Sequence, residues 1–274
     1  MPLTSRIRLV AAAVGLGLLA LPVTATGATA TPPKCPSASC QALLSGISDA
    51  FSVALDGHGA AFVSYWEGRV DRVDLTTGQA TTLATGLGNL RGVATDGNGT
   101  VYVTDFNGTV IQINVATGAH QATASGLSDG LMAVAYGNGH VYAGTTYGQL
   151  WEITAGQPRL VTDKAGMIAD LAFGPDGGVY VAEIGGTVSR VDPATGAVRT
   201  LASSQYEPQS VQVAPNGTVY FAAAGALHAI DPTTGKVSPD IILGARDNLW
   251  DFALGTTTVS LESGTLWKIT GYNG

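Results

Sequence analysis

The sequence predicts an all-β protein: a six-bladed β-propeller with four-stranded antiparallel blades, whose last blade is closed by an N-terminal strand. Three observations predict this fold. A unit of about 40 residues recurs six times, apolar and polar residues alternate with a period of two inside each unit, and glycine-containing turns separate the short runs. Short antiparallel strands repeated in this way are typical of blades arranged in a ring.

One recurring position, usually aromatic, marks each unit. Its positions are spaced by 40, 40, 38, 40 and 40 residues and are Phe62, Tyr102, Tyr142, Tyr180, Tyr220 and, in degenerate form, Ser260. Pairs such as Asn98-Gly99 and Asn216-Gly217 supply the positive φ angles that two-residue hairpin turns require. The 37 glycines of the chain follow from these repeated reversals.

The last unit is one strand short. It supplies strands only near residues 250–254, 257–261 and 265–270 before the chain ends. The segment 41–44 precedes the first unit just as 79–86 precedes the second, so we expect it to add the missing outer strand. Residues 31–46 are therefore interpreted as a latch segment and residues 47–274 as the propeller.

Residues 1–30 have the order of a secretory signal peptide: Arg6 and Arg8, thirteen apolar or small residues from 9 to 21, and a polar stretch that ends at Ala30. Thirteen helical residues span about 20 Å, less than the roughly 30 Å of a membrane core. We therefore expect a secreted, extracellular protein without membrane insertion. Cleavage removes two arginines and no acid, which changes the net charge from −7 to −9.

Export also determines the expected state of the two cysteines. Cys35 and Cys40 lie in the latch segment, and an oxidising compartment would allow them to form a disulfide, with free thiols as the alternative. The composition excludes other classes. With 45% hydrophobic and 12% charged residues the chain is not disordered, and an acidic chain without a basic stripe argues against a nucleic-acid partner. We expect a monomer.

Two stretches carry a resemblance. GVATDGNGTVYVTDFNGTVIQI resembles NHL-type repeats, and VYVAEIGGTVSRVDPATGAVRTL resembles the YVTN-type repeats of secreted bacterial propellers. The resemblance covers the chain after about residue 45 and implies the propeller fold. It leaves function open, because this superfamily spans binding modules, gluconolactonase-like enzymes and streptogramin lyases.

The site motifs of those enzymes are absent from the sequence. The lyases and the paraoxonase-like lactonases rely on histidine, but we expect His58, His120, His140 and His228 away from the variable loop face. The NDG…DP-G-R signature of gluconolactonases is missing too. The resemblance therefore implies no ligand set here, and any enzyme of this sequence would use a site made of carboxylates alone.

Variable loops on a rigid scaffold are where function concentrates. By position in the repeat, half of the twenty acidic residues fall on the face that carries the variable loops, together with several aromatic residues. We expect this acidic and aromatic face to bind a small molecule, glycan or peptide. The candidate ligand-binding residues are Trp66, Phe106, Tyr147, Trp250 and Arg91.

Two carboxylates share one register at the start of an innermost strand, where side chains line the central channel: Asp170 in the fourth unit and Asp251 in the sixth. Their repulsion could be relieved by calcium, magnesium, a cationic ligand or a shared proton. Asn89 and Asn248 could add neutral oxygens to such a metal site. The alternative is that these acids only hydrate the channel.

Asp105 and Glu183 share a second register, after the second strand, and are the candidate general bases. The alternative is that they cap their own loops by accepting hydrogen bonds from nearby amides. The leading functional hypothesis is a secreted binding or scaffolding propeller. A divalent-metal-dependent hydrolase or lyase and a structural wall component are the alternatives.

Overall fold

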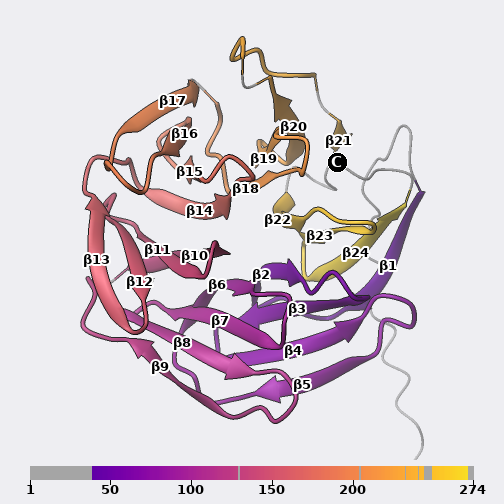
Figure 1. The fold of residues 1–274 in the computed structure, drawn as a ribbon. Coiled ribbons are helices and arrows are strands. Elements are labelled where there is room, and N and C mark those ends of the chain that lie inside the picture. The colour runs from indigo at the N-terminus through magenta and orange to yellow at the C-terminus, as the bar shows by residue number, and fades with distance from the viewer. Residues whose placement is uncertain are drawn as a thin grey trace, which may run out of the picture.

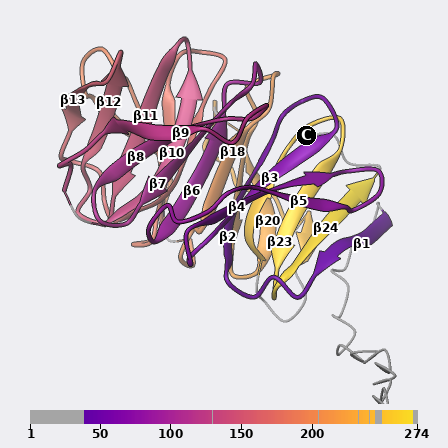
Figure 2. The same cartoon turned by 90° about the horizontal axis from the view of Figure 1, so that it is seen from below.

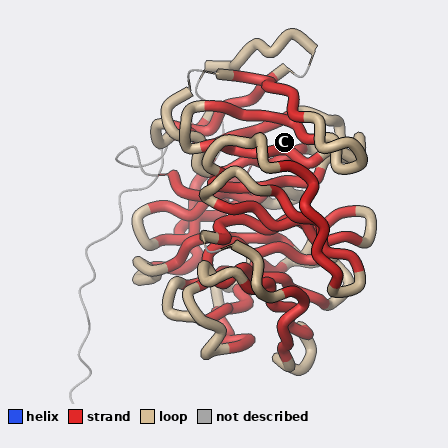
Figure 3. Tube along the Cα trace, turned by 90° about the vertical axis from the view of Figure 1, so that its left-hand side faces the viewer, coloured by secondary structure: helices blue, strands red, loops and turns tan. Residues whose placement is uncertain are grey.

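The computed structural model describes residues 39–128, 130–203, 205–231, 233–239, 241–243 and 249–270. In these residues the chain forms strands and loops without a helix (Figure 3). No helix in the described part of the chain is therefore long and apolar enough to cross a membrane. The expected signal peptide (residues 1–30), Cys35 and Asn248 lie outside the described residues, so the Cys35–Cys40 disulfide stays a prediction.

Six four-stranded antiparallel sheets surround a central axis, which confirms the six-bladed propeller (Figure 1). Each blade is numbered here by the order of its innermost strand in the chain. The first three blades are β2 (Ala50–Leu55), β3 (Ala60–Tyr65), β4 (Arg69–Asp74) and β5 (Ala80–Ala84); β6 (Leu90–Thr95), β7 (Thr100–Asp105), β8 (Thr109–Asn114) and β9 (His120–Ala124); and β10 (Leu131–Gly137), β11 (His140–Thr145), β12 (Leu150–Thr154) and β13 (Gln157–Thr162).

The other three blades follow the same plan. They are β14 (Ile168–Phe173), β15 (Val179–Glu183), β16 (Thr187–Val191) and β17 (Val198–Ala202); β18 (Ser210–Val213), β19 (Val219–Ala223), β20 (Ala226–Ile230) and β21 (Ile242–Leu243); and β22 (Leu249–Ala253), β23 (Thr258–Glu262), β24 (Thr265–Thr270) and β1 (Ser39–Ser45). The sixth blade thus takes its outer strand from the other end of the chain.

The predicted closing strand is confirmed. β1 pairs antiparallel with β24, from Ser39 opposite Thr270 to Ser45 opposite Thr265, and Figure 2 shows the two strands side by side at the outside of the ring. Leu43 and Leu44 pack against the apolar cluster between the sixth and first blades. The latch therefore joins the ends of the chain by main-chain hydrogen bonds and by apolar burial.

Apolar side chains pack between neighbouring blades. Alternate residues of each strand point to opposite faces of its sheet, so one face contacts the preceding blade and the other face the following blade. Phe62 of the first blade and Val103 of the second, for example, belong to one cluster of buried residues, and Phe221 of the fifth packs with Ala182 of the fourth. The blades are stable only against one another, which is why ring closure matters.

A β-bulge recurs near the start of the innermost strands of blades one, two, three, four and six. In β6, Arg91 and Gly92 together face Thr104. Ser64 donates its hydroxyl to the Arg91 carbonyl at 2.5 Å, and the Gly92 amide donates to the Thr104 hydroxyl at 3.0 Å. A bulge turns consecutive side chains toward the same side. In blades one, two, four and six both residues line the channel mouth, whereas β10 contributes Met132 alone because Ala133 packs between blades.

Candidate functional site

Successive positions at the start of the six innermost strands form two rings around the channel. In each blade, the residue of the upper ring directly precedes the residue of the lower ring in the sequence. The upper ring is Phe51, Arg91, Met132, Ala169, Gln209 and Trp250, and the lower ring is Ser52, Gly92, Ala133, Asp170, Ser210 and Asp251. Each ring takes one residue from each blade, so the two rings form a site to which the whole propeller contributes.

The upper ring is the wall of a pocket of about 330 Å³ at the mouth of the channel. All six of its residues line the pocket, and Ile184 and Glu207 complete the rim. Ser52, Gly92, Asp170 and Asp251 of the lower ring form the floor. The wall is mostly apolar, and its charged groups are Arg91 from the second blade and Glu207 from the fifth, which is across the ring.

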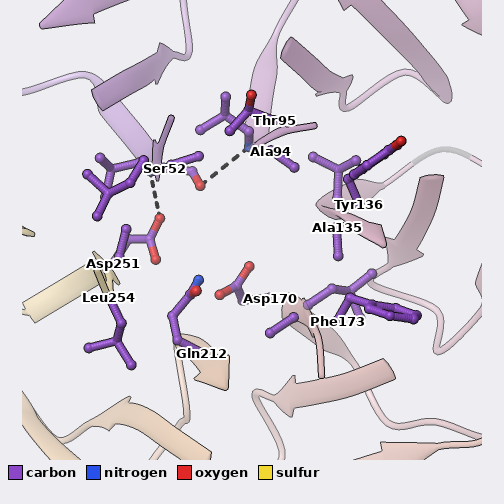
Figure 4. Close-up of a pocket in the computed structure, with 18 of the residues that line it drawn as sticks. Ser52, Ala94, Thr95, Ala135, Tyr136, Asp170, Phe173, Gln212, Asp251 and Leu254 are labelled. Atoms are coloured by element: carbon purple, nitrogen blue, oxygen red, sulfur yellow. Dashed lines mark hydrogen bonds between the residues drawn. The ribbon is translucent and has the colours of Figure 1, made fainter. Parts of the chain in front are cut away.

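A second hollow of about 190 Å³ lies further along the channel. Ser52, Asp170 and Asp251 line both hollows, so they lie where the two meet. Figure 4 shows these three residues and Gln212 directing polar atoms into the second hollow. The two aspartates predicted to share a register are thus brought together in the channel, at the point where the two hollows meet.

Asp170 and Asp251 are joined through Ser210 of the intervening blade. The Ser210 hydroxyl lies 2.9 Å from Oδ2 of Asp170 and also makes a short contact with Oδ1 of Asp251. A hydroxyl has one proton to donate. The second contact is a hydrogen bond only if one carboxyl group is itself protonated and donates to the Ser210 oxygen.

The environment of the pair favours that proton. Burial, followed by the charge of Asp251, raises the pKa of Asp170 from 3.8 to about 8. Burial also raises the pKa of Asp251, although hydrogen bonds from Ser210 and the Val53 amide oppose this shift. Retention of one proton by the pair would relieve the repulsion between the half-buried Asp170 and the buried Asp251.

The same side chains also tie blades together. Asp170 accepts a hydrogen bond from the Val211 amide of the next blade at 2.9 Å, and Asp251 accepts one from the Val53 amide at 2.8 Å. Ser52 accepts from the Val93 amide at 3.4 Å in the same way (Figure 4). This repeated contact gives the polar lower ring a structural role, beside any role in binding.

The metal hypothesis stays a prediction. Among the described residues no group of three or more His, Cys, Asp or Glu side chains could hold a metal ion. Asn89 directs its side-chain amide toward the Trp66 carbonyl at 3.4 Å, and its predicted counterpart Asn248 lies outside the described residues. The carboxylate oxygens of Asp251 already accept hydrogen bonds from Ser210, Val53 and Phe252.

The two candidate bases hold loops in place. Asp105 accepts hydrogen bonds from the Asn89 amide at 2.9 Å and from the Asn107 side chain at 3.0 Å. The buried Glu183 accepts one from the Gly166 amide at 3.0 Å. Neither side chain lines the channel-mouth pocket. Their contacts match the loop-capping alternative, in which the carboxylate satisfies amides of the loop that leads into the blade.

The five candidate ligand-binding residues separate into three groups. Arg91 and Trp250 line the pocket, and Trp250 also lines an adjoining hollow of about 440 Å³ that shares Glu207 and Gln209. Trp66 and Phe106 instead surround Arg91. Tyr147 is 71% exposed and lines neither hollow.

Arg91 is held by three aromatic rings. Its guanidinium carbon lies 3.9 Å from the ring centre of Phe51, 4.4 Å from that of Trp66 and 5.3 Å from that of Phe106. The buried Nε has no hydrogen-bond partner among the described residues. Burial lowers the pKa of this guanidinium. The rings hold a positive charge in place at the pocket wall, and no carboxylate of the described residues pairs with it.

Sequence reasoning missed Phe51, Ser52, Ser210, Met132 and Gln209. The repeat register contained the signal, because these residues occupy the positions equivalent to Arg91, Asp170 and Trp250 in other units. What the repeat did not reveal is the bulge, which occurs near the start of five of the six inner strands.

The fold and the pocket define a class of protein, a six-bladed β-propeller with a ligand-sized pocket at one mouth of its channel. The sequence model of a family described as outer membrane protein assembly factor BamB matches residues 120–273, more than half of the chain. The chain belongs to this family. No curated protein sequence matches the chain.

Solved structures share the fold. A protein provisionally described as a gluconolactonase superposes with a TM-score of 0.72 at 14% identity, covering 85% of this chain and 92% of that one. A protein of unknown function from Bacteroides thetaiotaomicron gives 0.70 at 15% identity, covering 84% and 72%. Virginiamycin B lyase from Staphylococcus aureus gives 0.65 at 12% identity, covering 86% and 99%. At these identities the similarity shows the fold alone, which agrees with the expected propeller superfamily.

Proposed function

We propose that this protein is a ligand-binding propeller that holds a small molecule, or one end of a glycan or peptide, in the pocket at the channel mouth. The observation that carries the proposal is the convergence of six equivalent positions, one from each blade, on a single pocket of about 330 Å³. That volume lies in the range of small-molecule sites, which typically combine apolar walls with a few polar groups.

The wall chemistry supports binding. Trp250 is 47% exposed although it is a large aromatic side chain, and it offers a flat face to a ligand. Glu207, at the rim, has a φ of 38°, a left-handed conformation that non-glycine residues rarely adopt. Strained backbone at the edge of a pocket is typical of functional sites.

The adjoining hollow suggests how a longer ligand would extend. It continues from Trp250, Glu207 and Gln209 toward Tyr206, which is 81% exposed. The family is named after an assembly factor, and a peptide segment of a partner protein is one ligand that would fit this description. We place this binding outside the cell, on the basis of the expected signal peptide in residues 1–30.

The enzyme alternative has less support from the described residues. The propellers named for lactonase and lyase activity share only the fold with this chain. All four histidines are among the described residues and none lines the pocket, while Asp105 and Glu183 are engaged with loop amides. We therefore propose binding rather than hydrolysis as the function of this face.

A pocket-filling variant tests the proposal. Ala169 lines the pocket, and Ala169→Trp would fill much of its volume. Ala116 is exposed in an outer turn, so Ala116→Trp is the matched control. Monosaccharides, amino acids and dipeptides would be screened by ligand-observed NMR. We expect ligands that bind the unmodified protein and the control but not Ala169→Trp. Equal binding to all three chains would show that the pocket is not the site.

A further inference from the structure

The charged residues of the pocket reveal what kind of ligand it suits. The structure describes six arginines, and four of them have a carboxylate oxygen within 4.0 Å: Arg69, Arg72, Arg159 and Arg190. Arg199 has no such partner but is exposed to water. Arg91 is partly buried and has no carboxylate partner among the described residues.

Arg69 provides the comparison within the same molecule. Its guanidinium carbon also lies over an aromatic ring, 4.0 Å from the ring centre of Tyr65. Glu67 and Asp71 each lie 3.7 Å from its Nε. Arg69, a ring-stacked arginine away from the pocket, thus has two acidic neighbours, whereas Arg91, at the pocket wall, has none among the described residues.

A desolvated positive charge without a partner is unfavourable unless something else compensates it. The three rings around Arg91 hold the guanidinium in place but carry no negative charge. A carboxylate presented by a ligand would accept two parallel hydrogen bonds from the planar guanidinium fork. The remaining wall has to be compatible with such a ligand.

The opposite side of the pocket has the complementary polarity. Glu207 and Gln209 come from the fifth blade, across the ring from Arg91 in the second blade. Both side chains can accept hydrogen bonds from hydroxyl or ammonium groups. The pocket wall between Arg91 and these two acceptors is formed by Phe51, Met132 and Trp250, which would contact an apolar or flat part of the ligand.

On the basis of the function proposed above, we infer that the pocket takes a small carboxylate ligand whose other end donates hydrogen bonds: the carboxylate pairs with Arg91, and the donors face Glu207 and Gln209. Two sources have this chemistry, an acidic sugar with its hydroxyl groups and an amino acid with its ammonium group. Either has a body that can lie against Trp250.

Isothermal titration calorimetry with matched pairs of probes tests the inference on the full chain. Galacturonate is compared with galactose, and phenylalanine with phenethylamine, so that each pair differs mainly at the carboxylate. We expect one carboxylate probe to bind at least tenfold more tightly than its counterpart. The pair that shows the difference identifies the source as a sugar or an amino acid.

Variants at the two ring-stacked arginines complete the test. Arg91→Gln should weaken binding of the carboxylate probe at least tenfold, Arg91→Lys should weaken it less, and the control Arg69→Gln should change it by less than twofold. If Arg91→Gln does not fold, the comparison of probes on the unmodified chain and Arg91→Lys decides. Binding by neither carboxylate probe, or equal binding by both members of the pairs, overturns the inference.

One result separates this inference from the proposed function. A probe whose affinity falls with Ala169→Trp but is unchanged in Arg91→Gln would leave the pocket as the binding site and overturn only the carboxylate contact. A probe that binds through Arg91 and is indifferent to Ala169→Trp would contradict the pocket itself.

Discussion

Asp170 and Asp251 contact the same side-chain oxygen, the hydroxyl of Ser210, although they come from the fourth and sixth blades. Each aspartate also accepts an amide hydrogen bond from the blade that follows it. The contact therefore links three blades where the two hollows of the channel meet. Two of the predictions below depend on this arrangement.

The first prediction concerns pH. Because the pKa of Asp170 is about 8 in the folded chain and 3.8 is its ordinary value, the folded state binds more protons than the unfolded state between these values. The free energy of unfolding should therefore fall as pH rises from about 4 to about 8, by at most about 1.4 kcal/mol per pH unit. Urea denaturation at pH 5 and pH 8 measures this slope.

The pH prediction is tested by comparing the unmodified chain with the variant Asp170→Asn. The amide imitates the protonated acid, so this variant should lose most of the slope and exceed the unmodified chain in stability at pH 8. The control is Asp192→Asn, because amide hydrogen bonds from Thr195 hold the pKa of the exposed Asp192 below its usual range. The control should keep the slope. An unchanged slope in Asp170→Asn would rule out the shared proton.

The second prediction concerns metal. Because the oxygens of Asp251 and Oδ2 of Asp170 already accept hydrogen bonds, we expect the thermal melting temperature to be the same with chelator and with added calcium, magnesium, manganese or zinc. A bound ion would stabilise the folded state by mass action. A shift of several degrees would instead favour the metal-dependent hydrolase or lyase.

The third prediction isolates the latch with a pair of glycines. Gly78 and Gly97 have φ angles of +73° and +69°, so alanine is strained at both. A Cβ at Gly78 would lie 2.3 Å from the Leu43 carbonyl oxygen of the latch, whereas at Gly97 the nearest atom would be 3.8 Å away. Gly78→Ala should melt several degrees below Gly97→Ala in circular dichroism. Equal melting temperatures would mean that β1 does not approach this turn.

The fourth prediction tests the latch as a whole. Deletion of residues 31–46 removes β1 and leaves β24 of the sixth blade as an exposed edge. The melting temperature of the whole propeller should fall, because the first and sixth blades lose the strand that joins them. Deletion of residues 1–30 is the control and should leave the melt unchanged. A melt unaffected by the longer deletion would contradict ring closure by β1.

The fifth prediction separates binding from stability at Arg91. Methionine has a similar length without the charge, and Arg91 is partly buried without a carboxylate partner among the described residues, so an apolar side chain that packs there should be neutral or stabilising. Arg91→Met should therefore melt at the same temperature as the unmodified chain or above it, measured without ligand. A fall of more than about 5 °C, several times larger than for Arg69→Met, would mean that Arg91 is there to stabilise the fold.

The sequence was sufficient for the architecture because turns and alternation are local properties. The glycine turns between the first two strands of most units, the spacing from Phe62 to Tyr220 and the missing strand of the last unit all follow from repeated local chemistry. The shared register of Asp170 and Asp251 could be predicted in the same way, since equivalent positions of a repeat face the same axis.

The roles of the candidate residues could be assigned only from distances in the tertiary structure. The repeat places Ser210 in the unit between the two aspartates, but it does not show that one hydroxyl contacts both of them. Nor does it show that Phe51, Trp66 and Phe106 lie around Arg91. Asp105 and Glu183 could have been bases or loop caps until their amide partners were known. These contacts join separate blades or loops, and their geometry is not encoded in any one segment.

The sequence by itself determined the six blades, the strand that closes them and the face on which the loops vary, because each follows from a repeated local pattern. The tertiary structure decided that a bulge turns two residues of most inner strands into the channel, which creates the pocket and its floor. It also decided which charged groups have partners: Asp170 and Asp251 meet at the Ser210 hydroxyl, and Glu67 and Asp71 lie beside Arg69. No carboxylate among the described residues pairs with Arg91 at the pocket wall, because burial and partnership depend on neighbours that only the closed ring brings together.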